Sequence, residues 1–428
     1  MSPRDTANEG EPAPKLVVQG LYKIFGDHPD RALKMLRDGQ DKSEIFEKTG
    51  QTVGVMDATF TVNEGEIFVI MGLSGSGKST LVRLLNRLIE PTAGEILVNG
   101  RDITAMSQSE LRQMRRRDMA MVFQSFALMP HLKVIDNAAF GLELGGTPRA
   151  ERHARALEAL EAVGLKAWAD SYPGELSGGM QQRVGLARAL ANDPSVLLMD
   201  EAFSALDPLI RSEMQDELLR LQSEQARTIV FISHDLDEAM RIGDRIAIME
   251  GGRIIQIGTP DEILRNPADD YVASFFRGVD VSKVLTAGAI CRRPLLEVAE
   301  RADQGVRTAA QRLKAHDFDH AVVVDRKRRY LGMVSVDSLA RTLKDENPAF
   351  TRALLPDTPS LAANQTVAEV LGVVADAPHP LAVVAEDGRY LGVVSKSILL
   401  RTLDRETETT YAEADHTAAA PGTSGEAA

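Results

Sequence analysis

A glycine-rich stretch between an apolar segment and a helical one constrains the fold of this chain more than any other feature. Residues 72–80 read GLSGSGKST and match the pattern G-x-x-x-x-G-K-[ST]. Residues 67–71, IFVIM, have the composition of a buried parallel strand, and residues 79–88 have the apolar spacing of a helix. This order predicts a phosphate-binding loop that follows a strand of an α/β sheet.

The residues of this loop predict how a nucleotide is held. Backbone amides of the turn and of the helix N-terminus face the phosphates, Lys78 reaches the β and γ oxygens, and the Ser79 hydroxyl can ligate Mg²⁺. We therefore expect a nucleotide site made by Gly72, Leu73, Ser74, Gly75, Ser76, Gly77, Lys78, Ser79 and Thr80.

Further motifs follow this loop in a characteristic order. Residues 176–183 read LSGGMQQR, and residues 196–201, VLLMDE, form an apolar segment that ends in two carboxylates. SALD follows at 204–207, and His234 comes directly after the apolar run TIVFIS. The set resembles the ATP-binding subunits of ABC transporters, in which LSGGMQQR corresponds to the signature motif. The resemblance implies ATP as the nucleotide and a P-loop ATPase domain with a RecA-like core and a helical subdomain.

The resemblance also implies a role for each motif residue. Mg²⁺ would be bound by Ser79, Gln124 and Asp200. Glu201 would orient or deprotonate the attacking water. His234, at the end of another strand of the same sheet, would contact the γ-phosphate and hold the water and Glu201 in register. The predicted catalytic residues are Lys78, Glu201 and His234.

An aromatic side chain is expected to stack on the adenine ring. Phe25, in the sequence YKIFG, matches the position of this residue in the family best. Tyr22 is the alternative, since either ring could stack on the base.

The LSGGMQQR loop is expected to serve a second subunit. In the family two ATPase domains face head to tail, so Ser177, Gly178, Gly179 and Gln181 of one subunit would close over the γ-phosphate bound by the other. Asp207 would link the two sites across the interface. The resemblance therefore implies a homodimer that ATP closes and hydrolysis loosens.

Composition limits the remaining classes of function. With 428 residues, of which 44% are hydrophobic, the chain is long enough for two or three domains. Its net charge of -13 argues against nucleic acid as a partner, and residues 115–117, RRR, are expected to line a solvated helix face. The single cysteine, Cys291, excludes an internal disulfide and suits the cytosol. We find no apolar run of about 18 residues and no signal peptide, so another polypeptide would have to supply any membrane channel.

The N-terminal part of the chain is predicted to be one ATPase domain, residues 15–277, after a disordered tail at residues 1–14. Its helical subdomain is expected at about residues 125–179. Residues 16–18 and 59–62 are predicted strands. Between them, residues 26–51 form a polar insertion that is predicted to contain two short amphipathic helices. The apolar residues of this insertion are Ala32, Leu33, Leu36, Ile45 and Phe46.

The insertion narrows the resemblance. Together with the sequences IFVIMGLSGSGKST, LNRLIEPT, MVFQSFALMPH and LMDEAFSALDPLIR, it is similar to the ATPases of osmoprotectant importers of the glycine betaine/proline type. This implies a permease partner, an external binding protein and a location on the cytoplasmic face of the cell (inner) membrane. Residues 126–130, FALMP, could receive a coupling helix of the permease. Alternatives are an importer ATPase for another small solute, a soluble ABC protein of translation or DNA repair, and an energy sensor with a degenerate ATPase.

The C-terminal part contains an internal repeat. RYLGMVSVDSLARTL at 329–343 recurs as RYLGVVSKSILLRTL at 389–403, and each copy follows an apolar strand, AVVVD at 321–325 and LAVVA at 381–385. Helical stretches precede these strands at 306–314 and 367–374. This α+β pattern resembles a tandem pair of CBS domains. The pair is expected at residues 284–404, as copies at about 284–345 and 350–404, before an acidic, disordered tail at residues 405–428.

The ligand of the CBS pair stays open. The family's ribose-contacting Asp usually stands three residues after the Ser of the G-x-V-S strand, where this chain has Ser338 after Ser335 and Ile398 after Ser395. This departure argues against an adenosine ligand, and an adenine nucleotide is kept as one alternative. The other is ionic-strength sensing through anionic lipid. The cations that could contact the lipid are Lys327, Arg328 and Arg329, which could equally form a solvated turn.

Overall fold

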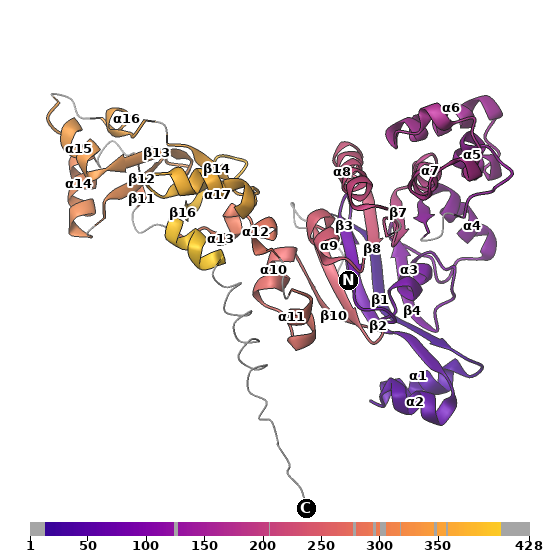
Figure 1. Ribbon diagram of the computed structural model, residues 1–428. Coiled ribbons are helices and arrows are strands. Elements are labelled where there is room, and N and C mark those ends of the chain that lie inside the picture. Colours follow the sequence, from indigo (N-terminus) through magenta and orange to yellow (C-terminus); the bar gives the residue numbers. More distant parts are fainter. Residues whose placement is uncertain are drawn as a thin grey trace, which may run out of the picture. The chain divides into compact units, whose positions relative to one another are not determined.

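The computed structural model describes residues 13–123, 127–204, 206–276, 280–293, 297–299, 305–316, 318–345, 349–356 and 358–403. The chain divides into two compact units, Met1–Phe275 and Phe276–Ala428 (Figure 1). Of the predicted disordered tails, residues 1–12 and 405–428 lie outside the described residues, and Pro14 already belongs to the first strand.

A six-stranded sheet forms the centre of the first unit, in the order β10-β9-β3-β8-β7-β6. All neighbours pair in parallel except β10 with β9. Every residue of β3, β7 and β8 is buried, as expected for parallel strands covered on both faces. The strands are β3 (Ile67–Met71), β6 (Met119–Val122), β7 (Val196–Asp200), β8 (Thr228–Ile232), β9 (Arg245–Glu250) and β10 (Arg253–Gly258).

A second, antiparallel sheet has the order β2-β1-β4-β5. It consists of β1 (Pro14–Phe25), β2 (Thr52–Asn63), β4 (Ala93–Val98) and β5 (Arg101–Asp102). The predicted strands at 16–18 and 59–62 are confirmed as parts of the longer β1 and β2. Phe60 of β2 stacks on Phe68 of β3 with ring centroids 5.1 Å apart, so the two sheets share one core.

The insertion at residues 26–51 contains two helices, as predicted. These are α1 (Pro29–Arg37) and α2 (Lys42–Thr49), which begins at the N-cap Asp41 and ends at Gly50 in the left-handed conformation. They bury Ala32, Leu33, Leu36 and Ile45 in a small core of their own against β1 and β2. Phe46, the remaining apolar residue of the insertion, lies outside this core and is 56% exposed.

The other helices of the first unit are α3 (Lys78–Leu85), α4 (Gln108–Arg117), α5 (Val134–Leu144), α6 (Arg149–Ala162), α7 (Gly178–Leu190), α8 (Pro208–Gln225), α9 (Leu236–Ile242), α10 (Pro260–Arg265) and α11 (Asp270–Phe275). Short 3₁₀ turns lie at Lys166–Trp168 and Pro173–Glu175. Figure 1 shows α5, α6 and α7 grouped beside the sheets, and within the described residues no helix is long and apolar enough to cross a bilayer.

Two sequence predictions about these helices need correction. The helix predicted at 79–88 ends at Leu85, because Arg87 adopts a positive φ of 53°. The triple arginine is only partly solvated. Arg115 donates to the carbonyl oxygens of Asn86 and Arg87 at 2.8 and 2.7 Å and thus ties α4 to the end of α3, while Arg116 and Arg117 are exposed.

The second unit contains the predicted repeat. Each copy has a three-stranded sheet, in the orders β11-β12-β13 and β14-β15-β16. In each copy a parallel pair precedes an antiparallel pair. The strands are β11 (Glu297–Ala299), β12 (His320–Val324), β13 (Tyr330–Ser335), β14 (Ser360–Ala362), β15 (Leu381–Val384) and β16 (Tyr390–Val394). The helices are α12 (Val281–Val284), α13 (Ala287–Ile290), α14 (Val306–Ala315), α15 (Val336–Thr342), α16 (Phe350–Ala353) and α17 (Val367–Asp376), and residues 396–403 are also helical.

The two copies join through reciprocal backbone bonds. The Tyr330 amide donates to the Gly388 carbonyl at 3.1 Å, and the Tyr390 amide donates to the Arg328 carbonyl at 2.9 Å. An apolar cluster that combines Val322 and Met333 with Ala382 and Tyr390 covers this junction. The repeats therefore form one body.

Candidate functional site

The glycine-rich loop joins β3 to α3 and needs glycine at specific positions. Gly72, Gly75 and Gly77 have φ of 153°, 79° and 101°. A Cβ on Gly72 would collide with the Met249 carbonyl oxygen, and one on Gly77 with the Gly54 carbonyl oxygen. The loop can therefore curl tightly only with glycine at these positions.

Polar groups inside the loop are poised for an anion. Lys78 is 6% exposed, and its Nζ donates to the carbonyl oxygens of Gly72 and Leu73 at 2.7 and 3.0 Å. Burial lowers the pKa of Lys78, and the charges of Glu201 and Asp200 offset only part of that shift. The Ser76 hydroxyl is buried without a hydrogen-bond partner. An orphaned hydroxyl and a buried ammonium fit a phosphate group.

Ser79, in the first turn of α3, contacts Asp200 at the end of β7. The Ser79 hydroxyl donates to Asp200 Oδ1 at 3.0 Å, and Arg83 lies 3.6 Å from Asp200 Oδ2. Asp200 is 2% exposed because it ends the buried strand β7. A hydroxyl and a carboxylate are hard oxygen ligands and fit Mg²⁺. Gln124, the third predicted ligand, lies outside the described residues.

Glu201 and His234 lie side by side because β7 and β8 are neighbours in the sheet. His234 Nδ1 is 3.5 Å from Glu201 Oε2. Glu201 has a φ of 48°, a left-handed conformation that costs a non-glycine residue about 1 kcal/mol. Its carbonyl oxygen accepts from the Ser204 hydroxyl at 2.9 Å, which helps to hold that conformation.

Two residues that sequence reasoning missed support this edge of the sheet. Glu238 of α9 is 7% exposed and accepts from Ser233, the residue before His234, and from Gln215 of α8. Burial raises the pKa of Glu238. The Tyr271 hydroxyl donates to the Met249 carbonyl and accepts from the Leu73 amide at 3.4 Å. Glu238 could have been noticed as an acidic residue one helical turn after His234, whereas nothing local marks Tyr271.

The two candidate adenine-stacking residues lie in different surroundings. The Phe25 ring lies 2.8 Å from where a Cβ of Gly54 would stand, and Thr80 of the glycine-rich loop is 3.4 Å from the same point. Phe25 is 40% exposed and carries Lys23 Nζ 5.1 Å from its centroid. Tyr22 packs on the insertion core. The geometry favours Phe25.

The residues expected to act in trans cap two helices. Ser177 is the N-cap of α7 and accepts from the Met180 amide, and Asp207 is the N-cap of α8 and accepts from the Ile210 amide at 3.1 Å. Ser177 and Gly178 are exposed, and Gly179 packs on Leu206. The Gln181 amide nitrogen donates to the carbonyl oxygens of Pro173 and Leu176 at 3.0 and 3.1 Å, so it shapes the loop.

Residues 127–130 present apolar groups at the surface. Ala127 and Pro130 are exposed, and Met129 is half-buried, while Phe126 lies outside the described residues. Ala127 has a φ of 46°, and its carbonyl oxygen accepts from Arg188 of α7 at 2.7 Å. This segment is therefore anchored to the helix that begins at the LSGGMQQR loop.

In the second unit the residues singled out for ligand binding have internal partners. Ser338 is buried and forms a reciprocal cap with Ser335. Arg328 pairs with Glu297 at 2.8 Å, and Arg329 pairs with Asp325 at 3.0 Å. Two of the three predicted sensor cations thus already have carboxylate partners.

Comparisons with known proteins identify relatives of both units. The family model described as "ABC transporter" matches residues 55–204, and the model described as "CBS domain" matches residues 287–345. The glycine betaine/proline betaine transport system ATP-binding protein ProV of Escherichia coli strain K12 is 57% identical over 393 residues, which cover 92% of this chain and 98% of the relative. The glycine betaine transport ATP-binding protein OpuAA of Bacillus subtilis strain 168 is 50% identical over 93% of this chain and 94% of its own length. A solved dimeric ATP-binding cassette, MJ0796 bound to ADP and Pi, is 31% identical, covers 57% of this chain and 98% of its own, and has a TM-score of 0.49.

Proposed function

The chain belongs to the ATP-binding subunits of glycine betaine/proline betaine ABC transporters, and on this premise we propose that it powers uptake of such solutes by an importer. It is an ABC-type ATPase whose ATP hydrolysis is coupled to transport. One observation carries the proposal: the motif residues converge on one edge of the six-stranded sheet. They are Lys78, Ser79, Asp200, Glu201 and His234.

The ATP phosphates bind in the loop at residues 72–80. Lys78 exchanges its bonds to the Gly72 and Leu73 carbonyl oxygens for phosphate oxygens, and the Ser76 hydroxyl gains a partner there. Ser79 and Asp200 would hold Mg²⁺, joined by Gln124, and this ion neutralises phosphate charge when bound. Phe25 stacks on the adenine.

Hydrolysis depends on a water molecule placed in line with the γ-phosphate. Glu201 accepts a hydrogen bond or the proton from this water. His234, 3.5 Å from Glu201, contacts the γ-phosphate and keeps the carboxylate in register. The Glu201 carboxylate thus faces the loop that follows β8, in which His234 lies.

A second copy completes the site. Ser177, Gly178, Gly179 and Gln181 close over ATP bound by the partner subunit, and Asp207 links the two sites. The exposure of Ser177 and Gly178 supports this, since a helix N-terminus with free surface is a ready anion site.

The remaining parts connect the ATPase to transport. This subunit lies on the cytoplasmic face of the inner membrane, where an integral membrane permease docks near its apolar segment at residues 127–130. An external binding protein delivers the solute to the permease. The CBS pair regulates the transporter in response to osmotic or ionic conditions, through an adenine nucleotide or anionic lipid.

The test is uptake of labelled glycine betaine into proteoliposomes that hold the complete transporter and ATP on the side of this subunit. Uptake that is competed by unlabelled quaternary amines such as choline but not by maltose, and that is lost with Glu201→Gln, is the expected result. ATP hydrolysis without betaine uptake would contradict the substrate and leave the ATPase assignment standing.

A further inference from the structure

A buried glutamine without a hydrogen-bond partner lies beside the catalytic edge of the sheet. Gln182 of α7 is 3% exposed, and neither its side-chain oxygen nor its nitrogen has a hydrogen-bond partner. A primary amide can donate two hydrogen bonds and accept two, and leaving it buried and unpaired costs free energy. A glutamine here therefore needs a partner that this conformation does not provide.

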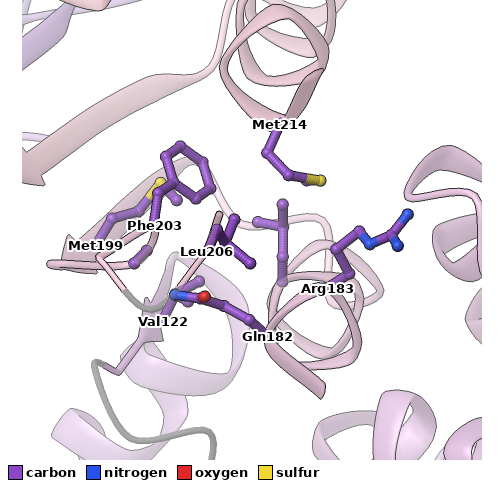
Figure 2. Close-up of a pocket in the computed structure, with 9 residues that line it drawn as sticks. Val122, Gln182, Arg183, Met199, Phe203, Leu206 and Met214 are labelled. Carbon is purple, nitrogen blue, oxygen red and sulfur yellow. The ribbon is translucent and has the colours of Figure 1, made fainter. Parts of the chain in front are cut away.

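The Gln182 amide borders a narrow void between α7, the end of β6 and the segment that follows β7. Its wall is mostly apolar, and Figure 2 shows the amide reaching from α7 toward Val122 and Leu206, with the Arg183 guanidinium pointing away. A buried water needs two to four polar partners, and this apolar wall offers it little besides the amide itself. We therefore look for the partner of Gln182 in the protein.

Three segments of the catalytic machinery meet at this void. Val122 ends β6, two residues before Gln124, and Ala202, Phe203 and Leu206 lie between Glu201 and Asp207. Gln182 belongs to the helix that Ser177 caps. Since the other lining side chains except Arg183 are apolar, the polar groups within reach of Gln182 among the described residues are backbone groups of these segments.

We propose that Gln182 is a positioning residue whose amide pairs with the backbone of Ala202, Phe203 or Leu206 when ATP closes the dimer. Closure acts on the N-terminus of α7, because Ser177 and Gly179 bind the partner's ATP. A helix transmits this displacement along its axis to Gln182. The new hydrogen bond then fixes the segment between Glu201 and Asp207. This inference rests on the roles proposed above for those residues.

Gln182→Met in the full-length protein tests the proposal, because methionine keeps the length of the side chain and removes the amide. Without nucleotide the thermal midpoint should rise by about 2–4 °C, since an unpaired buried amide is lost. The kcat for ATP hydrolysis should fall about tenfold, with the KM for ATP within about twofold of wild type. Leu186→Met, on the same wall, is the control and should change kcat by less than about twofold.

A lower thermal midpoint in nucleotide-free Gln182→Met, or an unchanged kcat, would overturn the proposal. A further measurement does not need turnover. In a Glu201→Gln background, ATP should raise the midpoint less when Gln182→Met is added, and an equal rise also overturns the proposal. Failure of the wild-type protein to hydrolyse ATP would instead refute the proposed function, so the two failures are distinguishable.

Discussion

At the proposed catalytic edge of the sheet, a regular strand end is followed at once by an unfavourable backbone conformation. Asp200 ends β7 as its last buried strand residue, and Glu201 turns out of the sheet with a positive φ. A non-glycine residue in this conformation is held there by its surroundings, here by the Ser204 hydroxyl. Such strain is typical of functional positions.

At this scale we expect Glu201→Gln to keep ATP binding and to lose most of the turnover. The amide preserves the shape of the side chain but cannot accept the proton from water, so kcat should fall roughly 10²–10⁴-fold. Steady-state hydrolysis and ATP-dependent dimerisation, measured by size-exclusion chromatography, check this. Normal hydrolysis by the variant would refute Glu201 as the base.

A second residue-scale prediction concerns Glu238. Burial raises its pKa above the ordinary 4.5, so the folded protein disfavours the charged form. Stability from this group is present below about pH 4.5 and is lost as the pH rises through the folded pKa. The unfolding free energy of Glu238→Gln relative to wild type should therefore increase as the pH rises from 4.5 to 8. Urea denaturation across this range measures the difference.

Glu110→Gln is the matched control for that measurement. Hydrogen bonds from Ser107 lower the pKa of Glu110, so its stabilising contribution is present at neutral pH and lost as the pH falls. Between pH 4.5 and 8 Glu110→Gln should therefore change little relative to wild type, because its change lies below about pH 4.5, whereas Glu238→Gln should gain stability. Parallel trends would contradict the burial argument for Glu238.

Among the elements, the insertion helices α1 and α2 depend on a few apolar contacts with β1 and β2. Ile45 is fully buried there, and its neighbour Phe46 is 56% exposed. We expect Ile45→Ala to destabilise the ATPase unit by about 2–5 kcal/mol through the lost transfer free energy and the cavity. Phe46→Ala should change stability by less than about 0.5 kcal/mol. Thermal unfolding of the two variants checks this, and equal losses would show that the insertion packs differently.

For the whole molecule, the CBS pair is one body that carries an exposed cationic turn at residues 327–329. Two of these cations already pair with carboxylates, so their replacement removes attraction to anionic lipid and a local ion pair together. We expect the combined change of Lys327, Arg328 and Arg329 to glutamine to weaken the response of betaine transport to salt. Uptake at increasing internal salt in vesicles with anionic lipid measures this. An unchanged salt response favours an adenine nucleotide as the regulator.

The sequence by itself determined the elements and the chemistry of this protein, because motifs such as GLSGSGKST and LSGGMQQR and the repeated RYLG segment are local and contiguous. It also predicted the insertion helices, whose apolar spacing is local. Only the tertiary structure decided that Glu238 and Tyr271 support the proposed catalytic edge, that Phe46 is exposed, and that Gln182 is buried without a hydrogen-bond partner. These facts depend on which segments meet in space, and no pattern within one segment records its neighbours.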